Sequence, residues 1–471
     1  MYPVWEGFIL HSAMVVAIVA VLHVLFSHVT VAATWFNWWV ERKSLLENKP
    51  YLQDYLKASA LRLLMFAYTI GAMTGVGIWF SVTGSNPRGI STLIHNFVFY
   101  WASEWFWFII DVFGIAVYYY TFGRVNPKVH ARIGLILALA ASGTLAIIVG
   151  ILGFKLSPGA WLQTGLSLDG FYNPTFWPML FARFGLMFAL TGLYAILVAS
   201  TMPQDHPARE EVVRLAGKVG LVGLVAGVAL ILLWYVPQLP EHAKTLLGIP
   251  QVVQPIFFYK MILGVVVTAI VLGLAFLAPK AVSRPAVGYL ALAIAFLGLF
   301  GAERTREAIR KPDVVLGYMA SNQIIRVDLK LGNREIRSEA PLLDQEGVLK
   351  RLPFAVTKGA ALAGPAGGVD PVETGRALVL LQCSSCHTVS QNTAFLGGTR
   401  NLAALLKRRG MTEASGIEAY LNAIGGFPYM HPVVGTPEER GYMAQYLARF
   451  VQEMYPQAAN PSHPVAQGGK R

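Results

Sequence analysis

The residues best suited to chemistry lie in one short segment, because Cys383-Ser384-Ser385-Cys386-His387 holds both cysteines of the 471-residue chain. Two thiols separated by two residues and followed by histidine form the C-x-x-C-H pattern, in which the thiols bond to the vinyl groups of a haem and the histidine ligates the iron. A disulfide framework is excluded because there is no other cysteine. A zinc site would need a second ligand pair, and a thioredoxin-like site would lie in a βαβ unit. The pattern therefore predicts one covalent haem c with His387 as an iron ligand.

The segments around this pattern resemble the small class I cytochrome c fold. "DPVETGRALVLLQCSSCH" (370–387) predicts a helix that leads into the haem site. "TPEERGYMAQYLARFV" (436–451) predicts an amphipathic helix with Thr436 as N-cap, Pro437 at its first position and acidic residues in its first turn. Between them, "FPYMHPVVGTPEER" resembles the family segment that carries the second iron ligand. The resemblance implies Met430 as that ligand, with His431 as its competitor; a thioether would raise the reduction potential relative to two histidines.

The elements that must position this site lie mostly in lipid. Hydrophobic residues make up 55% of the chain and charged residues only 14%, whereas about a quarter of the residues of a soluble domain are charged. Apolar runs of roughly 18 residues or more predict eight transmembrane helices. These runs are about 8–33, 58–82, 97–122, 130–156, 175–200, 214–236, 255–278 and 285–302. The first lacks a basic leader and a cleavage site, so we expect it to be retained as a span. From Glu303 onward the chain turns polar.

The basic residues predict the orientation, because short cytoplasmic loops carry an excess of Lys and Arg. The loops after spans 1, 3, 5 and 7 hold twelve such residues, whereas the opposite loops hold Arg88 and Lys244, with Lys155 at a span edge. We therefore expect a multi-pass protein of the inner membrane, with its N-terminus and its C-terminal domain on the periplasmic side. The formal net charge of +12 then reflects topology and a basic tail, and no nucleic-acid partner is needed.

Ionisable side chains inside the spans are costly and are therefore candidates for function. They are His11, His23, His28, Arg62, Glu104, Asp111, Arg183, Lys260, Glu303 and, one turn later, Arg306. Histidine, methionine and carboxylates in a membrane bundle are typical of b-type haem binding. The alternative for each residue is a paired or snorkelling side chain near a span end.

Four segments together resemble subunit I of cytochrome bd quinol oxidase over roughly residues 15–310. They are "LHVLFSHVTVA" (22–32), "GAMTGVGIWFSVTGSN" (71–86), "DVFGIAVYYYTFGR" (111–124) and "GLFGAERTR" (298–306). The resemblance implies that His23 ligates an active-site haem and that Glu303 is an axial ligand of a high-spin b haem. Arg306 matches the arginine of the same family motif.

Further roles follow from the same resemblance. Glu104 and Asp111 lie near two family carboxylates that serve oxygen reduction and proton delivery, and their spacing of seven residues places them on one helix face. Met261 lies close to the methionine that ligates the family's low-spin b haem.

The departures from the family fall on the quinol side. The family's span-5 histidine falls on Arg183, which would pair with a haem propionate, and His11, His28 or His95 would have to replace the missing ligand. The motif lacks its Q-P-W part, only about 18 residues separate spans 6 and 7, and a soluble extension replaces the ninth span. Exchange of electrons through cytochrome c is therefore favoured over an orthodox quinol oxidase.

These observations predict an all-α protein in which a polytopic bundle of eight transmembrane helices is followed by a small cytochrome c domain. The expected parts are a haem-bearing membrane domain (1–306), a periplasmic connecting segment and linker (307–371), the cytochrome c domain (372–455) and a disordered tail (456–471). The expected cofactors are one haem c and one or more b haems, with a haem d-like site as an option.

The favoured function is electron transfer between buried b haem and periplasmic c haem, as a subunit of a cytochrome bd-like respiratory complex. One alternative is a terminal oxidase that reduces oxygen with electrons from cytochrome c or quinol, and another is a membrane-anchored cytochrome c. The implied partners are a further membrane subunit, a periplasmic cytochrome c or other redox protein, quinone and the lipid bilayer.

Overall fold

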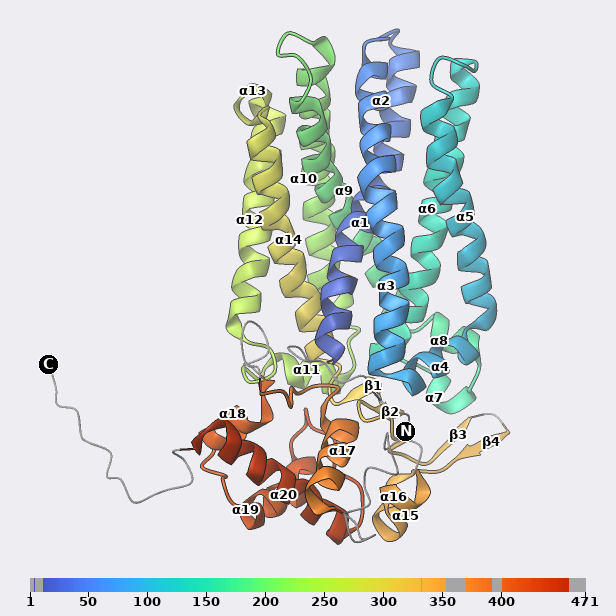
Figure 1. Ribbon diagram of the computed structural model, residues 1–471. Coiled ribbons are helices and arrows are strands. Elements are labelled where there is room, and N and C mark those ends of the chain that lie inside the picture. The colour runs from blue at the N-terminus through green and yellow to red at the C-terminus, as the bar shows by residue number, and fades with distance from the viewer. Residues whose placement is uncertain (1–3, 5–11, 332, 353–369, 392–399, 457–471) are drawn as a thin grey trace, which may run out of the picture.

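The structure is a computed structural model of the chain, and it describes residues 4, 12–331, 333–352, 370–391 and 400–456. Figure 1 shows a bundle of long helices that run side by side, with smaller helices and short strands gathered at one end. We call this end of the bundle the domain end. The residues that follow the last long helix, 309–456, are called the terminal part.

Eight stretches of helix in the described residues are long and apolar enough to cross a membrane, as the sequence predicted. They are α1 (Ser12–Leu46), α2 with η1 and α3 (Leu52–Arg62, Leu63–Tyr68, Thr69–Ser85), α5 (Val98–Tyr120), α6 (Pro127–Leu156), α9 (Phe176–Ser200), α10 with η2 (Pro207–Leu230, Ile231–Tyr235), α12 (Pro255–Leu277) and α14 (Pro285–Ala308). In lipid a helix satisfies its backbone groups within the segment, which explains why apolar runs of this length become helices. Helix α1 extends well past the predicted end at residue 33.

Shorter helices connect the spans at both ends of the bundle. They are α4 (Pro87–Asn96), α7 (Trp161–Thr164), α8 (Ser167–Phe171), α11 (Glu241–Leu247) and α13 (Pro279–Val282). Helix α4 begins after Asn86, whose side chain accepts a hydrogen bond from the Gly89 N–H, and Pro87 occupies its first turn.

Helix α9 is the centre of the bundle, because 61% of its apolar window is buried compared with 11% for α5. Glycines allow α9 and α10 to approach at backbone distance: a Cβ at Gly185 would lie 2.6 Å from the Gly227 nitrogen and 2.7 Å from the Gly223 oxygen. Helices α12 and α14 meet in the same way at Gly264 and Gly298. Lipid supplies no hydrophobic force between helices, so close packing of small residues holds them together.

The terminal part contains two small antiparallel sheets and several short helices. The strands are β1 (Asp313–Val315) paired with β2 (Met319–Ala320), and β3 (Leu329–Leu331) paired with β4 (Arg334–Ile336). The helices are α15 (Ala340–Glu346), α16 (Val348–Arg351), α17 (Pro371–Cys383), α18 (Leu402–Arg408), α19 (Ala414–Ala423), η6 (Ile424–Gly426) and α20 (Pro437–Met454).

Helix α20 begins as the sequence predicted. Thr436 is its N-cap, Pro437 lies in its first turn, and Thr436 and Glu439 form a reciprocal capping box. Helix α17 packs across α20 at Gly375, where a Cβ would overlap the carbonyl oxygen of Tyr442. The two helices therefore form the centre of one hydrophobic core.

The connecting segment 309–352 packs on the bundle and on the rest of the terminal part. Val315 and Tyr318 belong to a core shared with the bundle, whereas Leu343 and Val348 belong to the core of α17 and α20. The Arg88 guanidinium donates to both oxygens of Glu339 at 2.7 and 2.9 Å. These contacts, all between described residues, dock the terminal part on the bundle. The segment expected to be a flexible linker (359–371) lies almost wholly outside the described residues, and so does the expected disordered tail beyond residue 456.

We expect Gly375→Ala to loosen the terminal part, because the added methyl group would force α17 away from α20 at a cost of about 1–3 kcal/mol. The measurement is the temperature at which the C-terminal portion of the full chain becomes sensitive to protease, followed with a C-terminal tag. Gly441→Ala on α20 is the matched control, since nothing lies within 4 Å of a Cβ there. An equal fall in both variants would contradict the packing argument.

Candidate functional site

The C-x-x-C-H segment forms a tight turn at the end of α17. The Cys386 and His387 N–H groups both donate to the Cys383 carbonyl oxygen, at 3.1 and 2.9 Å. Both cysteines are free thiols and partly buried. The turn thus gathers two thiols and one imidazole in five residues, which is the donor set that covalent haem attachment requires.

The orientation of His387 suits an iron ligand. Its Nδ1 lies 3.1 Å from the Arg400 carbonyl oxygen, which only accepts, so Nδ1 carries the proton and Nε2 is left as the ligand atom. Burial, followed by the positive charge of Arg400, lowers the pKa of His387 to about 3. The imidazole is therefore neutral, which is the form that binds a metal. The residues of this segment fit a haem c.

The two thiols differ in their electrostatic surroundings. Burial raises the pKa of Cys383 to about 12. Burial acts in the same direction on Cys386, but the charges of Lys311 and Arg400 outweigh it and lower the pKa of that thiol. The Lys311 ammonium donates to the Cys386 sulfur at 3.2 Å.

The loop between η6 and α20 carries the two residues considered as the second iron ligand. Met430 and His431 are partly buried, and the charge of His431 acts on His387, so this loop faces the C-x-x-C-H turn. Tyr429 packs against a hydrophobic cluster at the domain end of the bundle. Met430 as the ligand remains a prediction.

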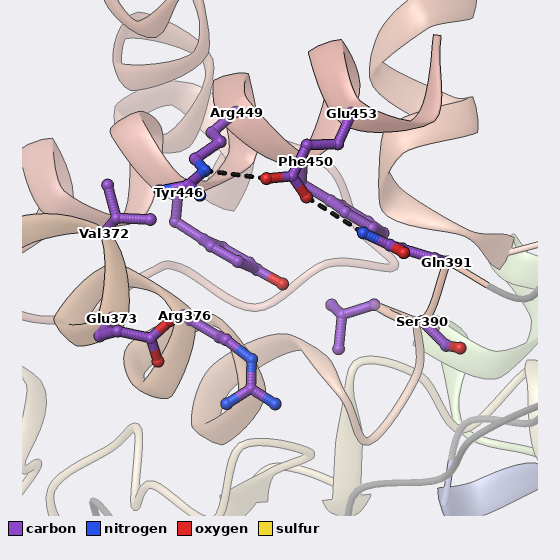
Figure 2. Close-up of a pocket in the computed structure, with 10 residues that line it drawn as sticks. Val372, Glu373, Arg376, Ser390, Gln391, Tyr446, Arg449, Phe450 and Glu453 are labelled. Atoms are coloured by element: carbon purple, nitrogen blue, oxygen red, sulfur yellow. Dashed lines mark hydrogen bonds and ion pairs between the residues drawn. The ribbon is translucent and has the colours of Figure 1, made fainter. Parts of the chain in front are cut away.

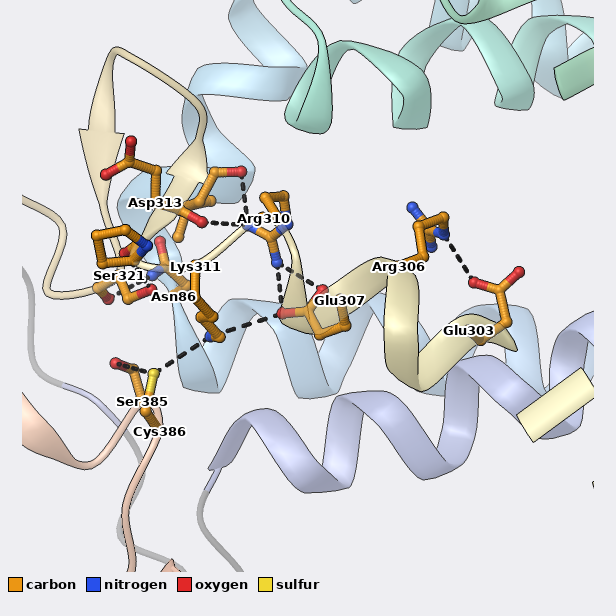
Figure 3. Close-up of polar contacts among 12 residues, drawn as sticks. Asn86, Glu303, Arg306, Glu307, Arg310, Lys311, Asp313, Ser321, Ser385 and Cys386 are labelled. Atoms are coloured by element: carbon orange, nitrogen blue, oxygen red, sulfur yellow. Dashed lines mark hydrogen bonds and ion pairs between the residues drawn. The ribbon is translucent and has the colours of Figure 1, made fainter. Parts of the chain in front are cut away.

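The turn lies directly against the end of α14, as Figure 3 shows. Lys311, which contacts Cys386, also lies 3.6 Å from Glu307 on α14. Glu307 is bound in turn by the Arg310 guanidinium, at 2.5 and 2.6 Å. On the other side of the turn, the Ser12 hydroxyl at the start of α1 donates to the Ser384 carbonyl oxygen at 3.5 Å. The C-x-x-C-H turn therefore contacts α1 directly, and Lys311, three residues after α14, links it to Glu307 of that helix.

His23 on α1 points toward α3. Its Nδ1 donates to the Gly71 carbonyl oxygen at 2.9 Å, which leaves Nε2 as the atom that could bind iron. A Cβ at Gly75 would lie 3.3 Å from the imidazole, so the glycine makes room for the ring. His23 fits the role of a haem ligand by its tautomer.

Glu303 on α14 lies in an ion-pair network that joins three spans. Its two oxygens accept from Arg183 on α9 and Arg306 on α14, both at 2.8 Å. Arg183 also donates to Nε2 of His28 at 2.8 Å. Each carboxylate oxygen retains one lone pair, so ligation by Glu303 remains a prediction that requires this network to open or to share an oxygen.

The network also bears on the residues considered as replacements for the missing span-5 histidine. Arg183 pairs with Glu303 and His28, and its pairing with a haem propionate stays a prediction. His95 is exposed, and its Nδ1 bonds to the Ser91 carbonyl oxygen. His11 lies outside the described residues.

The other predicted site residues lie on α12 and α5. Met261 packs on α14, since its Cγ would lie 3.2 Å from a Cβ at Gly301. Asp111 is buried and accepts a hydrogen bond from the Tyr68 hydroxyl at 2.7 Å. Glu104 is partly buried, and among the described residues it has no hydrogen-bond or ion-pair partner. Within the described ranges no three His, Cys, Asp or Glu side chains gather to hold a metal ion.

Sequence reasoning missed several polar residues. Glu41 is 1% exposed and lies 2.5 Å from Nδ1 of His130, while the Tyr118 hydroxyl donates to it at 3.0 Å. The sequence pattern did not indicate Glu41, because α1 extends beyond its apolar run, and His130 lies at the edge of the predicted fourth span. Lys311 and Tyr68 carried no signal, because their partners come from segments distant in the chain.

A surface pocket of about 370 Å³ lies beside α17 and α20, and Figure 2 shows its lining. Arg449 and Gln391 both bond to Glu453 at its rim, at 2.8 and 3.1 Å. None of the predicted site residues lines it, so this pocket is not the candidate site.

We expect Arg183→Met to destabilise the bundle by about 3–5 kcal/mol, because it removes one partner of a buried carboxylate and also the donor to His28. The measurement is thermal unfolding of the solubilised protein, followed by tryptophan fluorescence. Arg214→Met on α10 is the control, since the exposed pair of Arg214 with Glu210 should contribute at most about 1 kcal/mol. Equal falls in the unfolding temperature of the two variants would show that the buried network stabilises the protein no more than an exposed ion pair does.

Comparison with known proteins shows which known fold the chain resembles. No family model matches the sequence, and no curated protein matches it. Among solved structures, "The structure of bd oxidase from Geobacillus thermodenitrificans" contains a similar chain, with a TM-score of 0.57 and 15% sequence identity. The match covers 74% of this chain and 96% of that chain. At this identity the likeness establishes the architecture, and over 74% of its length this chain therefore has the fold of a bd oxidase chain.

Proposed function

We propose that the protein is a haem-bearing electron-transfer subunit of a bd-like respiratory complex in the membrane. It would exchange electrons between b-type haem in the bundle and a c-type haem held by the terminal part. The observation that carries this proposal is the contact of Lys311 with Cys386, which sets the C-x-x-C-H turn against the end of α14. Helix α14 also carries Glu303, five residues before its last residue.

The short path along α14 is the physical support for electron exchange. Five residues of helix span about 8 Å, so a group near Glu303 and a group on the turn would be close neighbours. Bound haem would supply the one-electron chemistry, while the chain supplies binding, orientation and electrostatics. Cys383 and Cys386 would anchor the haem c, His387 and Met430 would ligate its iron, and His23, Glu303 and Met261 would serve the bundle.

The docking of the terminal part on the bundle supports direct electron exchange between the two. The Arg88–Glu339 pair and the shared hydrophobic cores hold the terminal part on the bundle, so electron exchange would need no search by a tethered domain. The charge bias of the loops supports a periplasmic location for the domain end. Electrons would then pass between a periplasmic redox protein, the haem c and a bundle that associates with a further membrane subunit.

The test is the reduced-minus-oxidised spectrum of the purified chain, in which we expect both b-type and c-type bands. Cys383→Ala with Cys386→Ala should remove the c band and keep the b band, because the covalent anchors are lost. His23→Ala should diminish the b band and keep the c band. A spectrum with a c band alone would leave only a membrane-anchored cytochrome c.

A terminal oxidase is the second candidate, and the buried carboxylate on α5 favours it. Asp111 is held by Tyr68, and Glu104 lies seven residues away on the same helix face. Two carboxyl groups in line along a span are suited to delivering protons to a buried reaction site.

If the protein is an oxidase, we expect Glu104→Gln to lower oxygen consumption with reduced cytochrome c or quinol by about 10²-fold or more, because the amide cannot donate or accept the proton. The measurement uses an oxygen electrode, with the exposed Glu210→Gln as control. Unchanged turnover in both Glu104→Gln and His23→Ala would exclude the oxidase.

A further inference from the structure

The domain end of the bundle holds many more basic than acidic side chains in electrostatic contact. Two carboxylates, Glu303 and Glu307, lie among the basic residues Lys155, Arg183, Arg304, Arg306, Arg310, Lys311 and Arg400. We call these seven the cation cluster. Glu6 is the only acidic residue of the sequence outside the described residues, so the excess of cations remains wherever Glu6 lies.

The two carboxylates are already used. Glu303 accepts from Arg183 and Arg306, and Glu307 accepts from Arg310 and lies 3.6 Å from Lys311. The Lys155 ammonium and the Arg304 guanidinium, on the bundle helices, and the Arg400 guanidinium, in the terminal part, have no hydrogen-bond or ion-pair partner among the described residues. The Arg304 guanidinium lies 6.0 Å from the Phe257 ring. Three cations of the cluster are therefore unpaired, and two of them, Lys155 and Arg304, lie on the bundle helices.

The position of these two cations indicates where the ligand would lie. Lys155, at the end of α6, is in electrostatic contact with Glu307, Arg310 and Lys311. Arg304 on α14 is in contact with Arg400 and Cys386. Arg310 and Lys311 are only 5% and 9% exposed, and Figure 3 shows Lys311 between Glu307 and Cys386. Lys155 and Arg304 are both in electrostatic contact with Glu307, and Lys311, which lies 3.6 Å from Glu307, contacts the C-x-x-C-H turn.

The chemistry of the ligand follows from the charges. Cations held away from water are costly unless an anion compensates them. Arginine presents a planar fork that matches carboxylate or phosphate, and lysine binds the same groups as a point charge. A haem carries two propionate carboxylates, which would match Lys155 and Arg304, the two unpaired cations on the bundle helices.

We propose that Lys155 and Arg304 bind the propionate carboxylates of a haem at the domain end of the bundle. This inference rests on the proposed function and names the residues that would hold and tune one of its haems. The cations offset the negative charge of the propionates, which would otherwise favour the oxidised iron. Lys155 and Arg304 thus keep the reduction potential of that haem high enough for exchange across the interface.

The experiment is a spectroelectrochemical titration of the b and c bands in the purified full chain, combined with a pyridine haemochrome assay. In Lys155→Gln and in Arg304→Gln we expect the midpoint potential of one haem to fall, with partial loss of that haem if it is not covalently bound. Lys155→Arg should retain the wild-type potential. Lys244→Gln is the control, because Lys244 is a lysine on α11 paired with Glu241 at 2.8 Å. Should Lys155→Gln fail to accumulate, Arg304→Gln provides the same test.

Midpoint potentials and haem content that equal the wild type in both Gln variants would overturn the inference. Binding of a phosphate or a lipid headgroup to Lys155 and Arg304, in place of haem propionates, would also overturn it. Its signature is that inorganic phosphate raises the unfolding temperature of the wild type but not of Lys155→Gln, while the potentials stay unchanged. A wild-type spectrum without a b band would contradict the proposed function, and the potential of the c band would then decide the inference alone.

Discussion

The contact between the end of α14 and the C-x-x-C-H turn is the interaction on which the arrangement of this protein depends. Lys311 follows the last membrane helix by three residues, and its ammonium lies 3.2 Å from the Cys386 sulfur. The same lysine faces Glu307, so one side chain ties the turn to the helix. Arg88 and Glu339 reinforce the docking some distance away, on α4 and at the start of α15. The terminal part is therefore positioned by ion pairs as well as by apolar contacts.

The charged residues within the bundle are arranged by the cost of placing charge in lipid. Glu303, Arg183 and His28 come from three different spans, and the Arg183 guanidinium donates hydrogen bonds to the other two. Glu41, His130 and Tyr118 form a second buried group, again from three spans. Such groups hold α1 in register with its neighbours, because separating them would leave uncompensated charge. They also limit what any ligand can do, since a group that binds Glu303 must compete with two guanidinium groups.

Close approach of helices provides the rest of the rigidity. Gly185, Gly223 and Gly227 bring α9 and α10 into backbone contact, and Gly375 does the same for α17 and α20. Helix α5, by contrast, is little buried and carries Glu104 and Asp111 on one face. The bundle is closely packed at α9 and sparsely packed at α5. In the proposed complex, a further membrane subunit would cover α5.

The sequence by itself determined the features that depend on local patterns. Apolar runs identified all eight spans, since the length of the bilayer core sets the length of each run. Thr436, Pro437 and Glu439 identified the start of α20, because a capping box needs only neighbours in sequence. The C-x-x-C-H segment predicted a covalent haem from neighbouring residues alone, and this haem stays a prediction.

Only the tertiary structure decided which distant groups meet. Lys311 and Cys386 are 75 residues apart, and Arg183 and Glu303 are 120 apart. Nothing in the residues around His130 indicated its partner Glu41, because the pairing depends on how α1 and α6 pack. The docking of the terminal part could not be predicted for a related reason. Arg88 and Glu339, which contribute to it, are typical of surface charges in the sequence, and only the packing of their two segments makes them a pair. Local sequence determines which elements form, whereas long-range packing decides which charges lose water together and must therefore pair.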